Sequence, residues 1–281
     1  MQRMRGAGVP EGILRGLLVL LLTGGAVVFL VQRIVDYLLF QPSVGIDFKP
    51  EELGIRAESF HLATEDSVRV HAFYLPAARS DRALLFLHGN AGNASHRLPN
   101  AALLAAMDIN VLLLDYRGYG LSDGSPSEPG CYADARAALI HLMEQRGIPE
   151  DRIVLFGRSL GGAVAIDLAQ HRALAGVIVE STFTSLRDMV SGYIGPFAGL
   201  MSRGRFDSVT KVGSLRAPLL AFHGDVDQVV PYALGARLYE AVPTPKAFET
   251  LKGAGHNDTL QSGGAPYLAR IHAFIDRVAP R

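Results

Sequence analysis

Short apolar runs recur along the chain and alternate with longer stretches of mixed polarity. Five of these runs are Ala83–Leu87, Val111–Leu114, Ile153–Phe156, Val177–Val179 and Leu219–Phe222. Runs of this length without polar alternation are typical of strands covered on both faces, and the stretches between them have lengths that suit helices. The pattern therefore predicts an α/β fold, with a mostly parallel central sheet and helices on both of its faces.

Three further segments extend this sheet in the prediction. Ile55–Leu62 and Val68–Leu75 have strand-like composition and are joined by a polar turn at residues 64–67. Near the other end of the chain, Ala247–Leu251 is interpreted as the last strand, and a helical pattern follows over Tyr267–Val278.

The N-terminal segment differs in composition from the rest of the chain. Gly16–Val31 contains no charged residue and is rich in Leu and Val. A helix extended from Ile13 to Phe40, with Arg15 and Arg33 reaching toward the interfaces, would cross the hydrocarbon core of about 30 Å. A signal peptide would have a shorter apolar region, and a buried helix would not be apolar on all sides.

We therefore predict two parts of the chain: a cytoplasmic stub and transmembrane anchor at residues 1–40, and one globular domain at residues 41–281. The excess of arginine before the apolar segment predicts a single-pass membrane protein with a cytoplasmic N-terminus and the globular domain on the opposite side. Lys plus Arg equals Asp plus Glu, at 27 each, so no nucleic-acid partner is expected. Cys131 is the only cysteine, which excludes an intrachain disulfide.

The sequence GRSLG at residues 157–161 directly follows the apolar run that ends at Phe156. A serine between two glycines, at a switch from strand to helix, is the nucleophile elbow of α/β-hydrolases. The turn is so tight that a Cβ atom at either glycine would collide with the neighbouring strand or helix. The start of the helix also places unpaired N–H groups beside the serine. Ser159 is therefore the predicted nucleophile.

Two later loops contain the partners that such a serine needs, in the chain order serine, acid, histidine. Asp225 and Asp227 follow the run that ends at Phe222; we assign Asp227 as the acid and Asp225 as a turn former. His256 lies in a glycine-rich loop after the last predicted strand and is assigned as the base. His272 falls in a helical pattern, where a surface or packing role is expected.

The oxyanion of an acyl-transfer reaction needs two hydrogen-bond donors. The backbone N–H of Leu160, directly after the nucleophile, is one candidate. The second is the N–H of Asn90, in the loop that follows Ala83–Leu87 and begins with His88. His88 itself is interpreted as a support for this loop rather than as a base.

Other clusters of polar residues have simpler interpretations. The loop at residues 115–120 could touch substrate, but its charged groups more often hold loops together. His223, Asp225 and Asp227 have spacing that invites a metal site, yet a metal would need further ligands from elsewhere. The chain has neither a phosphate-binding loop nor a His-Glu-x-x-His motif. No metal and no cofactor are therefore expected.

Four segments together resemble a known family. They are HGNAGNASHRLPN (88–100), LLLDYRGYGLSDG (112–124), LFGRSLGGAVAI (155–166) and GAGHND (253–258). Their order and spacing are similar to the membrane-anchored serine hydrolases of the α/β-hydrolase-domain family, in the branch of the yeast bem-type hydrolases and their single-pass animal relatives. The resemblance covers nearly the whole chain from about residue 38 and implies a triad of Ser159, Asp227 and His256. Segment 179–183 departs from the pattern, because related proteins often have an asparagine before the threonine.

The predicted function is hydrolysis of a carboxylic ester or thioester through an acyl-enzyme. The resemblance does not settle the substrate, since relatives include lysophospholipid lipases and protein depalmitoylating thioesterases. We predict a lipid-like or acylated substrate, because a membrane anchor and an apolar cap would both favour substrates close to lipid. Residues 182–217 are predicted to form a short cap whose apolar side chains either line the path of an acyl chain or pack on the sheet. Two other functions stay open: a peptidase or acyltransferase using the same triad, and a non-catalytic membrane scaffold.

Overall fold

The computed structural model describes residues 25–30, 32–202 and 204–281. The chain divides into two compact units, residues 1–39 and 40–281. The described residues of the first unit, 25–30 and 32–39, are helical. In the described part of the chain, no helix is both long enough and apolar enough to cross a membrane. Residues 1–24, which hold much of the predicted anchor, lie outside the described residues.

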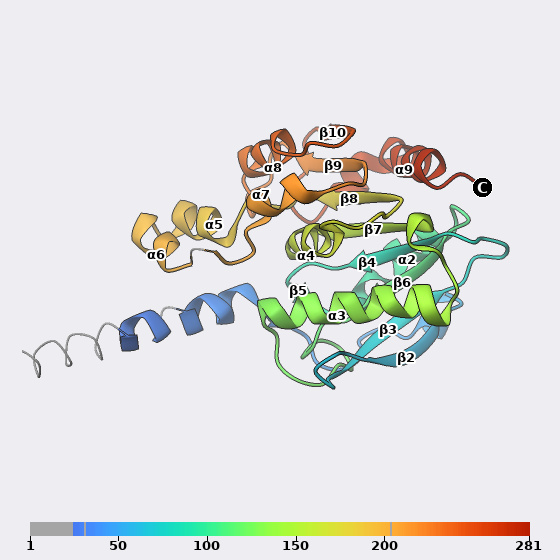
Figure 1. The fold of residues 1–281 in the computed structure, drawn as a ribbon, viewed down its shortest axis with the longest axis horizontal. Coiled ribbons are helices and arrows are strands. Elements are labelled where there is room, and N and C mark those ends of the chain that lie inside the picture. Colours follow the sequence, from blue (N-terminus) through green and yellow to red (C-terminus); the bar gives the residue numbers. More distant parts are fainter. Residues whose placement is uncertain (1–24, 31, 203) are drawn as a thin grey trace, which may run out of the picture. The chain divides into compact units, whose positions relative to one another are not determined.

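An eight-stranded sheet forms the centre of the second unit (Figure 1), with the strand order β10-β9-β8-β7-β4-β6-β3-β2. Its strands are β2 (Glu58–Ala63), β3 (Arg69–Leu75), β4 (Ala83–Leu87), β6 (Asn110–Leu114), β7 (Ile153–Arg158), β8 (Gly176–Glu180), β9 (Leu219–Gly224) and β10 (Lys246–Leu251). In this sheet β3 runs opposite to the other seven strands and is antiparallel to both of its neighbours, β2 and β6. The predicted mostly parallel sheet is therefore confirmed.

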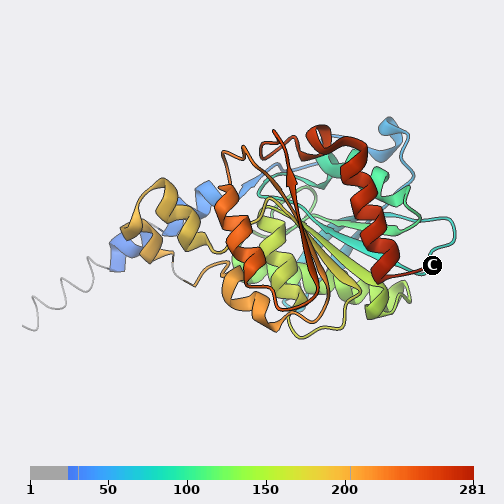
Figure 2. The ribbon, with the colours of Figure 1, turned by 90° about the horizontal axis from the view of Figure 1, so that it is seen from above.

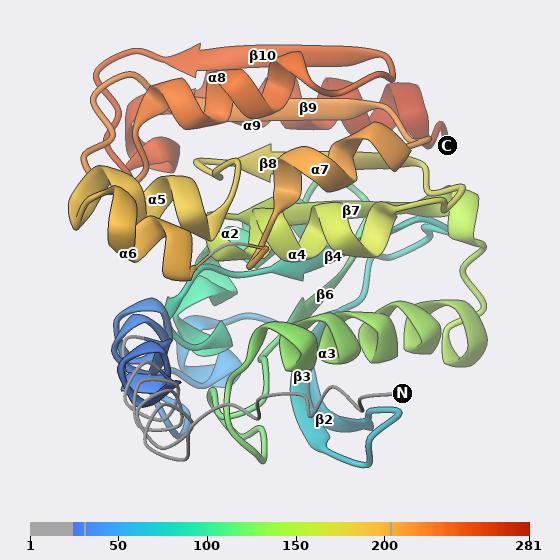
Figure 3. The same cartoon turned by 60° about the vertical axis from the view of Figure 1, so that its left-hand side comes forward.

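Helices cover both faces of this sheet, as predicted. Figure 2 shows α8 (Tyr232–Glu240) and α9 (Thr259–Val278) on opposite sides of the strands. In Figure 3, α3 (Glu128–Ile140) and α4 (Leu160–Ala169) share the face of α8, and α2 (Leu98–Ala105) lies behind the sheet with α9. Short helical turns occur at η1 (Pro50–Leu53), η2 (Ala94–Arg97), η3 (His141–Gln145) and η4 (Glu150–Arg152).

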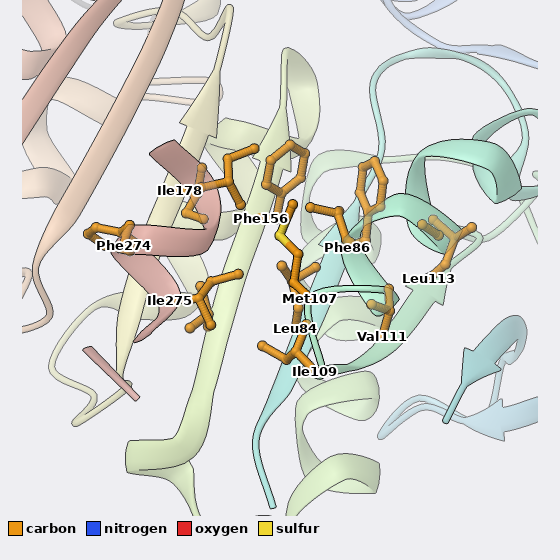
Figure 4. Close-up of a cluster of buried hydrophobic side chains, with 14 of the residues drawn as sticks. Leu84, Phe86, Met107, Ile109, Val111, Leu113, Phe156, Ile178, Phe274 and Ile275 are labelled. Carbon is orange, nitrogen blue, oxygen red and sulfur yellow. The ribbon is translucent and has the colours of Figure 1, made fainter. Parts of the chain in front are cut away.

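The central strands are buried on both faces, which explains why they lack polar alternation. Every residue of β4, β6 and β7 is buried. Figure 4 shows the apolar cluster between the sheet and α9, where Phe86, Phe156 and Ile178 from the strands lie near Phe274 and Ile275. Burial of a large apolar side chain contributes about 1.5–3 kcal/mol, so this cluster fixes the strands that end at the candidate site.

The segment between β8 and β9 contains α5 (Leu186–Tyr193), α6 (Pro196–Met201), α7 (Ser208–Lys211) and η5 (Val212–Ser214). The Ser185 side chain caps α5 by accepting a hydrogen bond from the backbone N–H of Asp188. Leu186 and Val190 are buried. Four large apolar side chains of this segment are instead exposed: Tyr193, Ile194, Phe197 and Leu200.

A short connector opens the second unit. Strand β1 (Gln41–Pro42) pairs in parallel with β5 (Ala91–Gly92), which belongs to the loop after β4. The Gln41 N–H donates to the carbonyl oxygen of Asn90 at 3.0 Å. Next to this strand, the Phe40 ring packs edge-on against Phe206, with the ring centroids 6.2 Å apart. The connector is thus joined to the loop that begins with His88.

Candidate active site

Ser159 occupies the sharp turn between β7 and α4. Its backbone has φ 53° and ψ −116°, a left-handed conformation that non-glycine residues rarely adopt. A Cβ atom at Gly157 would lie 2.3 Å from the carbonyl oxygen of Gly161, and one at Gly161 would lie 2.0 Å from that of Leu87. The two glycines therefore allow the close contact of strand and helix that exposes the serine, as the sequence predicts.

The structure brings the three predicted triad residues together from three separate loops. His256 Nε2 lies 3.1 Å from Ser159 Oγ, and His256 Nδ1 lies 2.8 Å from Asp227 Oδ2. The other carboxylate oxygen of Asp227 accepts hydrogen bonds from the backbone N–H groups of Val229 and Val230, each at 2.8 Å. The acid is thus fixed by its own loop while it orients the histidine.

Charge at the acid is stabilised despite its burial. Burial raises the pKa of Asp227, but hydrogen bonds from His256, Val230 and Val229 outweigh this effect and hold the pKa below its ordinary value. His223 is buried beside it, with Nε2 donating to the carbonyl oxygen of Val230 at 2.9 Å. Burial lowers the pKa of His223, which favours a neutral imidazole. Asp227 is therefore an ionised carboxylate with His256 as its main partner.

The loop after β4 brings Asn90 to the same site. A Cβ atom at Gly89 would lie 3.5 Å from the Ser159 Cβ, so the backbone of this loop passes close to the serine. Within the described residues, the backbone N–H groups of Asn90 and Leu160 have no acceptor in the protein. Both are therefore available to a substrate oxygen. The Asn90 carbonyl is held from behind by the Tyr119 hydroxyl at 2.7 Å.

Buried polar groups support this loop. His88 is fully buried, with Nδ1 2.7 Å from the Gly89 carbonyl oxygen and Nε2 3.5 Å from Asp115 Oδ1. Asp115 also accepts from the backbone N–H of Ala94 at 2.7 Å. Burial raises the pKa of Asp115, but the hydrogen bond with His71 and the nearby His88 ring outweigh this effect and lower the pKa overall. The contacts of His88 and Asp115 agree with the structural roles expected for both.

The rest of the loop at residues 115–120 also makes structural contacts. The Arg117 guanidinium forms ion pairs with Asp134 of α3 at 2.8 Å and with Asp66 at 2.7 Å. Tyr116 donates from its hydroxyl to the His88 carbonyl oxygen at 3.2 Å. These contacts join the loop to its neighbours, in agreement with the interpretation that its charged groups hold loops together.

Arg158 and Glu180 are part of the site, and sequence reasoning missed both. Arg158 Nε lies 2.8 Å from Glu180 Oε1, and its Nη2 donates to the carbonyl oxygen of His256 at 2.5 Å. Glu180 also accepts from the hydroxyls of Thr259 and Tyr267. The only signal in the sequence was indirect, because Arg158 lies within the elbow and Glu180 within the segment that departs from the family pattern.

A pocket of about 190 Å³ opens over the serine. Gly89, Asn90 and Ser159 line it together with Val229, Arg97 and Arg158. None of the described residues of the cap segment 182–217 lines this pocket, so the pocket does not have the apolar wall that was one of the two alternatives for this segment. The cap contacts the acid loop instead, where the hydroxyl oxygen of the exposed Tyr193 lies 2.7 Å from the carbonyl oxygens of both Gln228 and Val229 and can donate its hydrogen to either of them.

The remaining candidates lie outside the triad. Asp225 accepts from the backbone N–H of Gly253 at 2.7 Å and forms an ion pair with Lys252, so it organises its turn. His272 is on α9, 3.4 Å from Asp276. Among the residues that the structure describes, no group of three or more His, Cys, Asp or Glu side chains is arranged to hold a metal ion.

Serine hydrolases of the α/β-hydrolase family have such a sheet. They carry a serine at the turn after the fifth strand, with a histidine and an aspartate within hydrogen-bonding reach. This protein is one of them. The sequence model of the family described as serine aminopeptidase, S33, matches residues 78–209. The esterase Pf2001 of Pyrococcus furiosus has the same fold, with a TM-score of 0.69 and 21% identity over 86% of this chain and 98% of the esterase.

Relatives that match over most of their own length show more closely which family the chain belongs to. Protein bem46 of Schizosaccharomyces pombe is 35% identical over 240 residues, which cover 80% of this chain and 79% of bem46. The uncharacterised protein Rv2307c of Mycobacterium tuberculosis is 35% identical over 266 residues, which cover 93% of this chain and 94% of the relative. The chain therefore belongs to the α/β-hydrolase-domain family that includes bem46.

Proposed function

We propose that this protein hydrolyses a carboxylic ester or thioester through an acyl-enzyme formed on Ser159. The observation that carries the proposal is the unbroken hydrogen-bond chain from Asp227 through His256 to the Ser159 hydroxyl. Because Asp227 accepts a hydrogen bond from the Nδ1–H group of His256, the Nε2 atom has its lone pair directed at the serine. The name of the structurally similar esterase supports an ester as substrate.

The proposed reaction has two steps. His256 Nε2 removes the proton of Ser159 as Oγ attacks the carbonyl carbon, and the N–H groups of Asn90 and Leu160 stabilise the oxyanion. The intermediate expels the alcohol or thiol, which takes the proton from His256. Water then attacks the acyl-enzyme with His256 again as base, releasing the acid and restoring Ser159.

We further propose that the substrate is lipid-like or acylated and that residues 1–40 anchor the protein in a membrane. The uncharged run Gly16–Val31 and the exposed apolar side chains of α5 and α6 support this proposal. The N-terminus is cytoplasmic and the catalytic domain lies on the opposite side. Protease protection of sealed vesicles tests this orientation, because the catalytic domain should be cut only from that opposite side.

Labelling with a fluorophosphonate probe tests the nucleophile. Full-length protein in detergent should be labelled, and both Ser159→Ala and His256→Ala should abolish labelling. His272→Ala is a matched control, because this histidine also follows Asp227 in the chain but lies on α9. A folded wild-type protein that stays unlabelled would contradict the enzyme assignment and favour a scaffold. Hydrolysis rates over a series of acyl esters of increasing chain length then test whether the substrate is lipid-like. A steep fall of the rate with chain length would exclude a lipid-like substrate.

A peptidase is the second candidate function, because the matching family model is described as serine aminopeptidase, S33. An amide needs protonation of a poorer leaving group than an ester does, but the triad is the same. Paired ester and amide substrates with the same acyl group separate the two functions. We expect the ratio of kcat/KM for the ester to that for the amide to exceed the ratio of their uncatalysed hydrolysis rates. A higher kcat/KM for the amide would identify a peptidase.

A further inference from the structure

The pocket over Ser159 contains more positive than negative charge. Two arginines, Arg97 and Arg158, line it together with the serine. Glu180 is the carboxylate that pairs with Arg158, at 2.8 Å. In the described part of the chain, no carboxylate lies within ion-pair distance of Arg97. The Arg97 guanidinium beside the nucleophile therefore has no ion-pair partner of its own, and the charge of Glu180, which pairs with Arg158, acts on it only from a distance.

The surroundings of Arg97 destabilise its positive charge. Its Nη2 donates to the carbonyl oxygen of Ala91 at 3.1 Å, but its Nε is buried and has no hydrogen-bond partner. Burial lowers the pKa of Arg97, and the nearby positive charge of Arg158 lowers it further, while the negative charge of Glu180 offsets these effects only in part. A partly buried cation that is repelled by a second cation is normally compensated by an anion.

Arg158 is not available for the same task. Its Nε is paired with Glu180, and its Nη2 donates to the His256 carbonyl oxygen and to Asn257 Oδ1. These contacts use Arg158 to hold the loop of the base. Arg97 makes one hydrogen bond to a backbone oxygen, so most of its five N–H donors remain for a ligand. The planar guanidinium suits the oxygen pair of a carboxylate or phosphate.

We propose that Arg97 binds an anionic group of the substrate, so that the preferred esters or thioesters carry a carboxylate or phosphate close to the scissile carbonyl. This inference rests on the proposed function and specifies its substrate class. The anionic group can belong to the acyl chain, as in a monoester of a dicarboxylic acid. It can also belong to the leaving group, as in an acyl ester of a phosphorylated or carboxylated alcohol.

Two matched pairs of substrates test the inference on full-length protein in detergent. The first pair compares p-nitrophenyl hexanoate with the mono-p-nitrophenyl ester of adipic acid, which places a carboxylate at the end of the acyl chain. The second pair compares 4-carbamoylphenyl hexanoate with 4-carboxyphenyl hexanoate, which places the charge on the leaving group. The selectivity is the ratio of kcat/KM for the anionic member to that for the neutral member.

We expect a selectivity of roughly tenfold or more in at least one pair, as one charge-assisted contact provides. Arg97→Gln should bring that ratio to about one, and Arg97→Lys should retain part of it because the charge remains. The KM of the preferred anionic ester should rise with ionic strength. Arg136→Gln is the control, because Arg136 pairs with Glu65 away from the pocket, and it should leave the ratio unchanged.

The outcomes separate this inference from the proposed function. Hydrolysis of the neutral esters that depends on Ser159, with no anionic preference in either pair, would overturn the role of Arg97 and leave the esterase function intact. A preference that persists in Arg97→Gln would overturn the role equally. If none of the four esters is hydrolysed and Ser159 stays unlabelled, the proposed function fails, and the inference fails with it.

Discussion

Arg158 holds the backbone of His256. The Arg158 guanidinium donates to the carbonyl oxygen of His256 at 2.5 Å while it pairs with Glu180 at 2.8 Å. The residue directly before the serine thus fixes the loop that carries the histidine. Since proton transfer depends on a hydrogen bond of about 3 Å, a small displacement of this loop should weaken catalysis strongly.

We therefore expect Arg158→Gln to lower kcat by roughly 10- to 100-fold, because the histidine loop loses its anchor while Ser159 and Asp227 remain. The rate of fluorophosphonate labelling should fall in parallel, which reports on the serine rather than on substrate binding. Arg172→Gln provides the matched control, since Arg172 pairs with Glu150. Labelling at the wild-type rate in Arg158→Gln would contradict a positioning role.

Asp227→Asn should reduce kcat by about 10³- to 10⁴-fold with little change in the free energy of unfolding. The N–H groups of Val229 and Val230 would hold the amide oxygen, so the amide NH2 group would donate to Nδ1 of His256. The proton of the histidine would then lie on Nε2, which could no longer act as the base. Asp225→Asn is the comparison, because Asp225 only accepts from Gly253 and pairs with Lys252. If the two variants lose activity equally, the assignment of the acid is wrong.

Gly161→Ala should destabilise the fold by about 3 kcal/mol or more, because the new Cβ would lie 2.0 Å from the backbone oxygen of Leu87. The nearest atoms all belong to the backbone of Leu87 and His88, so no flexible side chain can move away. Gly213→Ala is the control, since nothing lies within 4 Å of a Cβ there. Thermal melts of the two variants measure the difference, and equal melting temperatures would contradict the predicted crowding.

Stability should depend on pH through His223. Burial lowers the pKa of this histidine in the folded state, so the unfolded chain binds its proton first as the pH falls. Its contribution to stability is therefore complete above about pH 6.5 and is lost as the pH falls from there toward the folded pKa. Urea unfolding between pH 8 and 5.5 measures this loss. The change in the free energy of unfolding per pH unit should be smaller in His223→Gln. An unchanged pH dependence would mean that other groups cause the loss of stability.

The sequence was sufficient to predict the elements whose own residues carry the signal. Runs such as Ala83–Leu87 are apolar throughout because both of their faces are buried. GRSLG encodes the turn at Ser159 because only glycine fits two positions before and two positions after the serine. The loops of Asp227 and His256 were recognisable because they follow strands in the expected chain order. Their contact in space agrees with that order, although their catalytic roles remain predictions.

Features that depend on register could not be predicted in this way. Arg158 and Glu180 are direct partners across β7 and β8, a relation that exists only once the two strands are aligned. The antiparallel placement of β3 between β2 and β6 has no signature in a single strand either. The apolar residues of the cap did not indicate which way their side chains point. Tyr193, for example, is exposed and contacts the acid loop rather than the pocket.

The pairing of β1 with β5 matters for how the enzyme is prepared. The two residues Gln41 and Pro42 look like dispensable linker, and shortening the chain to improve its solubility would naturally remove them. Yet the Gln41 N–H is one of the groups that hold the Asn90 carbonyl. A shortened protein should therefore begin before Phe40. One that begins at residue 44 would have an altered oxyanion loop, and its low activity would be mistaken for a need for lipid.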